Sequence, residues 1–145
     1  LMIHGRSLKQ LFSGPINLEI IKESRKYFSG VILANGGINN LAEAKKICLA
    51  TGVDGVALAR GALGQPWIFS PKMQNISGEK KEKLAIKTAL KHLKLVLKNR
   101  GEISYNEFKG QLAWYLKDFS GASALRSKVM SAKSYQEIKK ILQEK

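Results

Sequence analysis

The sequence is poor in acidic residues and cysteine, and it has no long apolar run. Its 145 residues include 25 Lys and Arg against 11 Asp and Glu, a formal net charge of +14. The single cysteine, Cys48, excludes an intrachain disulfide framework, which is typical of proteins from a reducing cytoplasm. Because no apolar run is long enough to span a bilayer, we expect a cytoplasmic protein without a membrane partner.

The sequence also lacks the residue sets that several kinds of catalysis require. It contains two histidines, and no Ser/His/Asp constellation, metal-spaced Cys/His set or pair of carboxylates can be assembled from it. Asp54 lies at the start of a predicted strand, far from the end where chemistry is expected. Cys48 lies among apolar residues of a predicted helix and is expected to be structural. We therefore expect no metal site and no evident acid, base or nucleophile beyond His4.

Short apolar segments alternate with amphipathic ones in the first half of the chain. Asn40 and Glu43 have the spacing of a helix capping box, and Gly52 is typical of a helix end. The predicted elements are strands at 1–4, 31–33 and 55–58, helices at 17–27 and 40–50, and a short turn or helix at 62–69. Connections this short predict parallel strands in β-α-β-α-β order. Strands that are apolar on both faces require partner strands or closure into a barrel.

Glycine follows the carboxyl ends of all three predicted strands, and arginine accompanies it at two of them. The segments are His4-Gly5-Arg6, Asn35-Gly36-Gly37 and Ala59-Arg60-Gly61. Glycines let backbone N–H groups approach a ligand closely, and a helix N-terminus behind them favours an anion. One glycine pair alone is better explained as a tight turn, but three coincident strand ends favour a phosphate site. Arg60 would pair with phosphate oxygens, and His4 is expected to lie beside them.

The composition changes after Pro71, where we place a domain boundary between residues 1–71 and 72–145. Residues 71–145 hold 17 Lys and Arg against 7 Asp and Glu, whereas residues 1–70 hold 8 against 4. Helices are predicted at 79–100, 104–119, 122–130 and from 134 onward, with a capping box at Ser104 and Glu107. Their short connections predict an antiparallel four-helix bundle. Trp114 and Tyr115 are expected in its core rather than as a platform for base stacking.

The basic excess of the second half has two possible explanations. The basic residues either form a solvated surface or contact a polyanion. As the polyanion, nucleic acid is favoured over a membrane. Lysines recur along one face of the predicted helix 79–100, where they would contact a phosphate backbone. The candidate RNA-binding residues are Arg6, Lys83, Lys87, Lys91, Lys94, Lys98, Lys109 and Arg126.

Several segments together resemble the tRNA-dihydrouridine synthase family. Ile3–Arg6, Leu33–Ile38, Thr51–Gly55 and Ala59–Phe69 are similar to the second half of its barrel. Two further segments are similar to its helical tRNA-binding domain, namely Ala113–Lys117 and Gly121–Arg126. The resemblance implies an α/β fold, a partial TIM barrel holding the last three strand–helix units, followed by an all-α helical bundle domain.

The resemblance also implies a reaction and its cofactors. Family members use FMN, which NADPH reduces, and then reduce the C5–C6 bond of a uridine extruded from tRNA. The matching positions imply that the FMN phosphate is held by Asn35, Gly36, Gly37, Ala59 and Arg60. They also imply that His4 lies near the flavin ring.

The chain departs from the family pattern at several positions. Gly37 replaces an aspartate, Ala59 replaces a glycine and Asp118 replaces a common glycine. The catalytic cysteine and a flavin-contacting lysine of the family belong to the first half of the barrel, and Cys48 does not match that cysteine. We therefore expect a fragment that lacks catalytic residues, is inactive alone and is able to self-associate through its open half-barrel.

Two alternatives remain open from the residues. Residues 72–145 would serve as a freestanding basic RNA-binding module. Otherwise, the chain would be a phosphate-binding barrel enzyme of metabolism with an unrelated helical tail.

Overall fold

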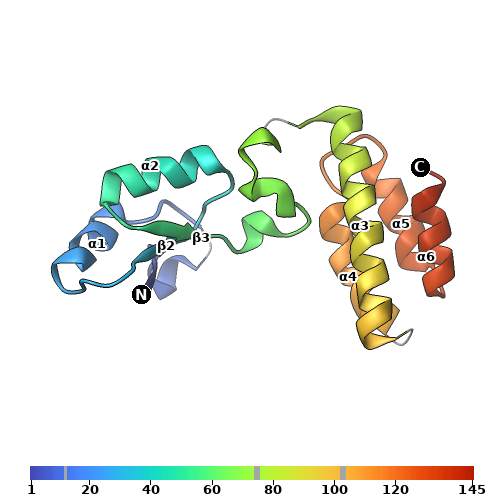
Figure 1. Ribbon diagram of the computed structural model, residues 1–145, viewed down its shortest axis with the longest axis horizontal. Helices are drawn as coiled ribbons and strands as arrows, with labels where there is room; N and C mark the ends of the chain where they lie inside the picture. The colour runs from blue at the N-terminus through green and yellow to red at the C-terminus, as the bar shows by residue number, and fades with distance from the viewer. Residues whose placement is uncertain (12, 74–75, 102–103) are drawn as a thin grey trace. The chain divides into compact units, whose positions relative to one another are not determined.

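A computed structural model describes residues 1–11, 13–73, 76–101 and 104–145. The chain divides into two compact units, residues 1–62 with 66–74 and residues 63–65 with 75–145. In Figure 1 the first unit is a small sheet with helices α1 (Leu18–Glu23) and α2 (Leu41–Thr51), and the second is a group of helices that includes the long helix α3 (Gly78–Arg100). Each unit has an apolar core of its own.

The first unit is built on a parallel sheet whose three strands follow the order β1-β2-β3. The strands are β1 (Met2–His4), β2 (Leu33–Asn35) and β3 (Gly55–Ala57). The register pairs His4 with Asn35 and Asn35 with Ala57, so the last residues of all three strands form one row. The parallel β-α-β-α-β order expected from the sequence is confirmed.

Strand β2 begins later than predicted. We expected a strand at residues 31–33, but β2 starts at Leu33, and Val31 is 64% exposed. The reason is a side chain from elsewhere in the chain, since the Ile32 backbone amide donates to the Asp54 carboxylate at 2.8 Å. A side-chain acceptor therefore takes the amide of a residue that the apolar pattern placed within the strand.

Two helices supply most of the remaining core of the first unit. They are α1 (Leu18–Glu23), which continues as a 3-10 turn at Ser24–Lys26, and α2 (Leu41–Thr51). Ile3, Ala34 and Val56 share one row of the sheet and belong to the cluster that includes Ile21 and Ile47 of these helices.

The opposite face of the sheet carries the alternate residues. Met2 and His4 flank Ile3 in β1, so their side chains point away from the α1 and α2 core. Both side chains are exposed. One face of the sheet is thus packed on the two helices, and the other presents part of its surface to solvent.

The Asn40 and Gly52 caps of α2 form as the sequence indicated, but Glu43 binds the Asn39 amide instead of the Asn40 amide that a capping box requires. The Asn40 side chain accepts a hydrogen bond from the Glu43 backbone amide at 2.8 Å. The Glu43 carboxylate in turn accepts from the Asn39 backbone amide at 2.8 Å. Gly52 ends the helix in the left-handed conformation, with φ of 69°. Short 3-10 turns follow β3 at Arg60–Ala62, Pro66–Phe69 and Pro71–Met73.

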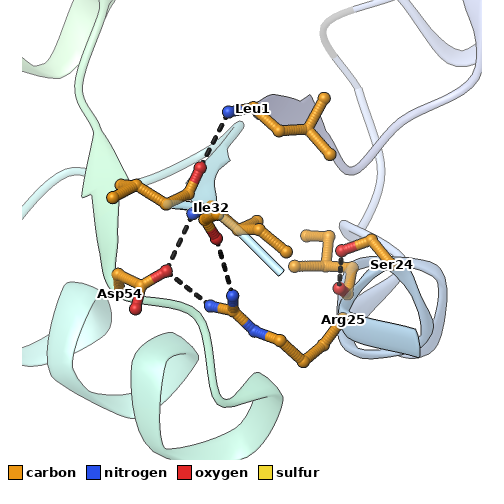
Figure 2. A network of polar contacts seen from close by, with 8 residues as sticks. Leu1, Ser24, Arg25, Ile32 and Asp54 are labelled. Carbon is orange, nitrogen blue, oxygen red and sulfur yellow. Dashed lines mark hydrogen bonds and ion pairs between the residues drawn. The ribbon is translucent and has the colours of Figure 1, made fainter. Parts of the chain in front are cut away.

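Arg25 and Asp54 join the amino ends of β2 and β3 (Figure 2). Their side chains pair at 2.5 Å, and Arg25 also donates to the Gly30 carbonyl at 2.7 Å. The hydrogen bond from the Ile32 amide, followed by the one from Arg25, lowers the pKa of Asp54 below its ordinary value of 3.8. Asp54 is thus a structural acid at the amino end of the sheet, where the sequence placed it.

In the described residues of the second unit, four helices surround one apolar core. They are α3 (Gly78–Arg100), α4 (Tyr105–Tyr115), α5 (Ala122–Ser131) and α6 (Tyr135–Gln143). Every helix contributes buried side chains to a common cluster, which includes Leu93, Phe108, Leu112, Leu125, Val129, Ile138 and Leu142. Among the described residues, no helix has the length and apolar character needed to cross a membrane.

Helix α4 is shorter than the predicted helix 104–119. The chain leaves the helix at Leu116, and Asp118 adopts a left-handed φ of 59°. The Arg126 guanidinium on α5 donates to the Leu116 carbonyl, while the Leu116 side chain is fully buried. A distant arginine and burial of Leu116 therefore end the helix before the predicted position.

The predicted capping box at Ser104 and Glu107 does not form. The Ser104 hydroxyl donates to the Arg100 carbonyl at 3.3 Å, and Glu107 pairs with the Arg100 side chain at 3.2 Å. Both groups bind the end of α3 instead of capping α4. The prediction of the box was wrong because Arg100 competes for both partners.

Candidate functional site

Hydrogen bonds tie the carboxyl ends of the three strands together. The Gly5 amide donates to the Asn35 carbonyl at 3.0 Å. The Asn35 side-chain amide donates to the Ala57 carbonyl at 2.8 Å. The three strand ends that the sequence grouped into one site are therefore held at one edge by Asn35.

The double glycine after β2 is required both by backbone conformation and by space. Gly36 and Gly37 have φ of 118° and 63°. A Cβ on Gly36 would lie 3.4 Å from Cε1 of His4, and a Cβ on Gly37 would lie 2.7 Å from Nη2 of Arg6. The turn consequently brings an imidazole and a guanidinium against bare backbone.

The segment after β3 approaches the same turn. A Cβ on Gly61 would lie 2.5 Å from the Ile38 carbonyl oxygen. Ala59 and Arg60, which immediately precede Gly61, are exposed. The structure thus brings the Ala59–Gly61 segment beside the segment that follows β2, with glycine permitting the contact.

His4 has a defined orientation at this edge. Its Nδ1 accepts a hydrogen bond from the Arg6 backbone amide at 3.3 Å. A ring nitrogen that accepts from an amide carries no proton, so the neutral imidazole carries its proton on Nε2. His4 therefore offers an N–H donor beside Gly36.

A cavity of about 390 Å³ adjoins the double glycine. Its lining includes Arg6, Gly36, Gly37, Glu43 and Lys46, with apolar side chains from the two helices. The Arg6 Nε donates to the Gly14 carbonyl at 2.9 Å, which orients the guanidinium. Ala59 and Arg60 do not line this cavity, so it covers only the β1–β2 part of the predicted site.

Arg6 and Lys46 differ from what the sequence suggested. Arg6, predicted to contact RNA, lies in the first unit against the double glycine. Lys46 was not among the predicted site residues. Its position three residues after the capping residue Glu43, on the same side of α2, is the signal that would have identified it.

Three of the predicted RNA-binding residues have partners within the second unit. Lys83 pairs with Glu79 at 2.5 Å, and this carboxylate raises the pKa of Lys83. Lys109 donates to the Met130 carbonyl at 3.3 Å. Arg126 donates to the Leu116 carbonyl. These contacts give Lys109 and Arg126 structural roles between helices.

The remaining predicted lysines all lie on α3. They are exposed and form no ion pair within the described residues: Lys87, Lys91, Lys94 and Lys98. The cationic surface available to a ligand therefore begins after the first turns of α3 and follows the helix toward its C-terminal end.

Beside these lysines, α3 and α6 border a groove of about 600 Å³. Leu90 and Leu97 line it from α3, together with Lys91 and Lys94. Tyr135 and Lys139 line it from α6, and the sequence analysis did not identify either of them. Their spacing of four residues on one face of a helix was the available signal.

The Trp114–Tyr115 pair is divided between core and surface. The Tyr115 hydroxyl lies 3.1 Å from Nδ1 of His92, whose ring packs edge-on against Phe108. Burial lowers the pKa of His92 and raises that of Tyr115. Trp114 is 41% exposed, with the Lys117 ammonium 5.2 Å from its ring centroid. Adjacent helical residues point about 100° apart, so only Tyr115 faces the core.

Within the ranges that the structure describes, no group of three or more His, Cys, Asp or Glu side chains is arranged to hold a metal ion. Cys48 is half-buried and packs against the core of the first unit.

Comparison with known proteins gives a consistent result over the whole chain. The family model described as dihydrouridine synthase (Dus) matches residues 1–145. A probable tRNA-dihydrouridine synthase 1 of Synechocystis sp. is 33% identical, over 98% of this chain and 41% of the relative.

Two further relatives are also described as probable tRNA-dihydrouridine synthases. The one from Mycobacterium tuberculosis is 28% identical over 94% of this chain and 37% of the relative. The one from Rhizobium leguminosarum is 28% identical over 94% of this chain and 43% of the relative. The chain thus spans about two fifths of the length of the curated relatives it matches.

Proposed function

This chain belongs to the dihydrouridine synthase family, and we propose that it forms part of an enzyme that reduces uridine in tRNA to 5,6-dihydrouridine. The proposed cofactor is FMN, the proposed reductant is NADPH and the proposed compartment is the cytoplasm. Because the chain spans about two fifths of its relatives, this activity is proposed for the whole protein.

The proposal rests on the cradle formed by Gly36, Gly37 and Gly61 at the carboxyl edge of the sheet. At Gly37 a Cβ would meet the Arg6 guanidinium, and at Gly61 it would meet the Ile38 carbonyl oxygen, so glycine lets these segments pack closely at this edge. A glycine turn next to a guanidinium suits a dianionic phosphate. Arg60 follows β3, and Arg6 lies against Gly37, so the residues present fit the phosphate of FMN.

Each proposed cofactor contact has a distinct task. Bound FMN would supply the hydride for the C5–C6 bond of uridine. Gly36, Gly37, Ala59 and Arg60 would hold its phosphate, while Asn35 keeps the two strand ends at a fixed separation through Ala57. The Nε2–H of His4 would donate to an acceptor of the flavin ring, since its Nδ1 is already engaged.

The helical unit is the proposed tRNA-binding part. The exposed α3 lysines Lys87, Lys91, Lys94 and Lys98 have no acidic partner within the described residues, which suits a phosphate backbone. A freestanding RNA-binding module remains a second candidate, because this unit has a core of its own. A metabolic enzyme with an unrelated tail is not supported, since the family model extends through residue 145.

We expect residues 1–145 alone to be inactive in uridine reduction. The family resemblance implies a cysteine as proton donor, and Cys48 instead packs beside the core of the first unit. Self-association through the open half-barrel is also proposed. Size-exclusion chromatography of this chain would detect it as a concentration-dependent rise in apparent mass.

The activity is tested with the product of the natural reading frame that contains this sequence. Incubation with NADPH and tRNA lacking dihydrouridine is expected to add two hydrogens to specific uridines, as measured by mass spectrometry. FMN is expected to copurify with the protein. A protein that neither retains flavin nor reduces tRNA under these conditions would contradict the proposal.

A matched pair of glycine variants tests the cradle. Gly37→Ala and Gly52→Ala both place an alanine at a φ near +65°, but only the Gly37 Cβ meets a neighbour, Arg6. We expect Gly37→Ala to lower flavin occupancy at least tenfold and Gly52→Ala to leave it unchanged. Equal flavin loss in both variants would show that backbone strain, and not the cradle, controls occupancy.

A further inference from the structure

The groove between α3 and α6 combines an apolar floor with a cationic rim. Leu90 and Leu97 of α3 and the Tyr135 ring of α6 provide the apolar part. Lys91, Lys94 and Lys139 provide the charges. Its volume of about 600 Å³ lies within the roughly 300–1,000 Å³ typical of ligand sites. No acidic side chain is among the residues that line it.

The positive charge of the rim is not neutralised by the protein. Within the described residues, Lys91, Lys94 and Lys139 form no ion pair. The acidic side chains of this unit that the structure describes bind elsewhere. The pairs are Glu79–Lys83, Glu82–Lys145, Glu107–Arg100, Asp118–Lys81 and Glu144–Lys140, while Glu137 accepts from the Lys133 amide. Three like charges around one groove favour an anionic occupant.

The apolar floor indicates which part of an anion enters the groove. A duplex presents mainly phosphates to a basic surface, and lysines alone would suffice to bind it. An aromatic ring flanked by leucines instead suits the flat face of a base or ribose. Tyr135 is partly buried against the core and stands at the capped start of α6, so its ring is ordered before binding.

We propose that this groove holds an unpaired nucleotide of the tRNA, with its base against Tyr135 and its phosphates near Lys91, Lys94 and Lys139. The inference rests on the proposed function and adds to it the part of the substrate that the helical unit recognises. A nucleotide in a loop can turn its base outward, whereas a paired nucleotide cannot do so without losing its partner. Recognition at this groove is therefore of a loop and not of a stem.

The test compares variants of the whole natural protein by fluorescence anisotropy. The probes are tRNA, a single-stranded oligoribonucleotide and a duplex of equal length, each titrated at several salt concentrations. We expect Tyr135→Leu to weaken single-strand binding about 5- to 150-fold, the loss of one stacked base, and Tyr135→Phe to stay within about twofold. Duplex binding is expected to change little in either variant.

The neighbouring residues Lys139 and Lys140 provide a charge control that leaves the core untouched. Lys139 lines the groove, whereas Lys140 pairs with Glu144 at 3.9 Å. Affinity for the single strand falls as salt rises, and we expect Lys139→Gln to make the slope of log affinity against log salt less steep by roughly 0.7. Lys140→Gln is expected to leave that slope unchanged.

The outcomes separate this inference from the proposed function. If Tyr135→Leu and Lys139→Gln both bind single-stranded RNA with wild-type affinity, the proposed nucleotide site in the groove is wrong, even if tRNA is still reduced. Binding of an acidic peptide or of anionic vesicles, without any binding of single-stranded RNA, would overturn it as well. Tyr135-dependent RNA binding without uridine reduction would instead support the groove and contradict the enzyme.

Discussion

The two units use their charged residues in different ways. In the first, Arg25 pairs with Asp54, Arg6 donates to a carbonyl and Glu43 caps a helix, so many charges support the fold. In the second, the α3 lysines after Lys83 have no ion-pair partner among the described residues. The first unit would therefore contact a ligand mainly through backbone whose conformation is set by glycines. The second would contact it mainly through positively charged side chains. Steric substitutions should affect the first site most, whereas salt should affect the second.

The largest expected effect comes from a glycine that supports the helical unit. A Cβ on Gly64 would lie 1.8 Å from the Trp114 carbonyl oxygen, at a φ of 74°. Because backbone would have to move, we expect Gly64→Ala to lower the free energy of unfolding by about 3 kcal/mol. Chemical denaturation followed by circular dichroism measures this change.

Gly121→Ala is the matched control for Gly64→Ala. Gly121 has φ of 77° and ψ of 0°, and the nearest atom to the added Cβ is Lys145 Nζ at 3.6 Å, an ordinary contact. We expect it to cost only the conformational strain of the left-handed region, about 1 kcal/mol. Equal losses in the two variants would show that the approach to Trp114 does not matter.

The next effect concerns acid stability of the first unit. The pKa of Asp54 is lower in the folded protein than in the unfolded chain. Its contribution to the free energy of unfolding is therefore complete above pH 3.8 and is lost as the pH falls through the folded pKa. We expect Asp54→Asn to destabilise the first unit at pH 7, with the difference from wild type shrinking below pH 3.8. Hydrogen exchange of peptides from residues 1–62 reports this unit separately. A difference that is independent of pH would contradict the assigned role.

A smaller and distinct pH effect is expected in the second unit. Burial lowers the pKa of His92, so the unfolded chain binds a proton more readily than the folded one. The contribution of neutral His92 to the free energy of unfolding should be complete above pH 6.5 and should fall as the pH drops from there toward the folded pKa. His92→Gln should remove this dependence, as measured by hydrogen exchange in residues 78–143. An unchanged pH profile in His92→Gln would assign the effect to another group.

The smallest expected effect comes from single lysines on α3. Each exposed lysine makes at most one phosphate contact, so Lys87→Gln should reduce tRNA affinity only a few-fold and lower the salt slope by less than about one. Lys83→Gln should reduce tRNA affinity less than Lys87→Gln does, because Lys83 is paired with Glu79. A larger loss from Lys83 than from Lys87 would show that the pair opens to bind RNA.

Features with local causes were predictable from the sequence. The parallel strand order follows from short connections, and the α2 cap from Asn40 and Glu43. The glycines after β2 and β3 were identified because they lie within a few residues of the end of an apolar strand. The three strand ends could be grouped because parallel strands end at one edge.

Features with distant causes were missed. The start of β2 depends on Asp54, 22 residues after the amide that it binds. The end of α4 depends on Arg126, ten residues away on another helix. The α3–α6 groove exists only because these two helices pack together, so neither helix predicts it alone. Such effects depend on tertiary contacts, which periodicity and spacing do not encode.

The most direct test is a steady-state comparison of two variants of the whole natural protein, with dihydrouridine in tRNA as the product. One is Gly37→Ala, and the other replaces Lys87, Lys91, Lys94 and Lys98 with Gln. The account predicts that Gly37→Ala loses activity at every tRNA concentration through loss of flavin. It predicts that the lysine variant raises KM for tRNA at least tenfold and keeps kcat near the wild-type value. A lysine variant with unchanged KM, or a fully active Gly37→Ala with normal flavin content, would contradict the division between shaped backbone and charge.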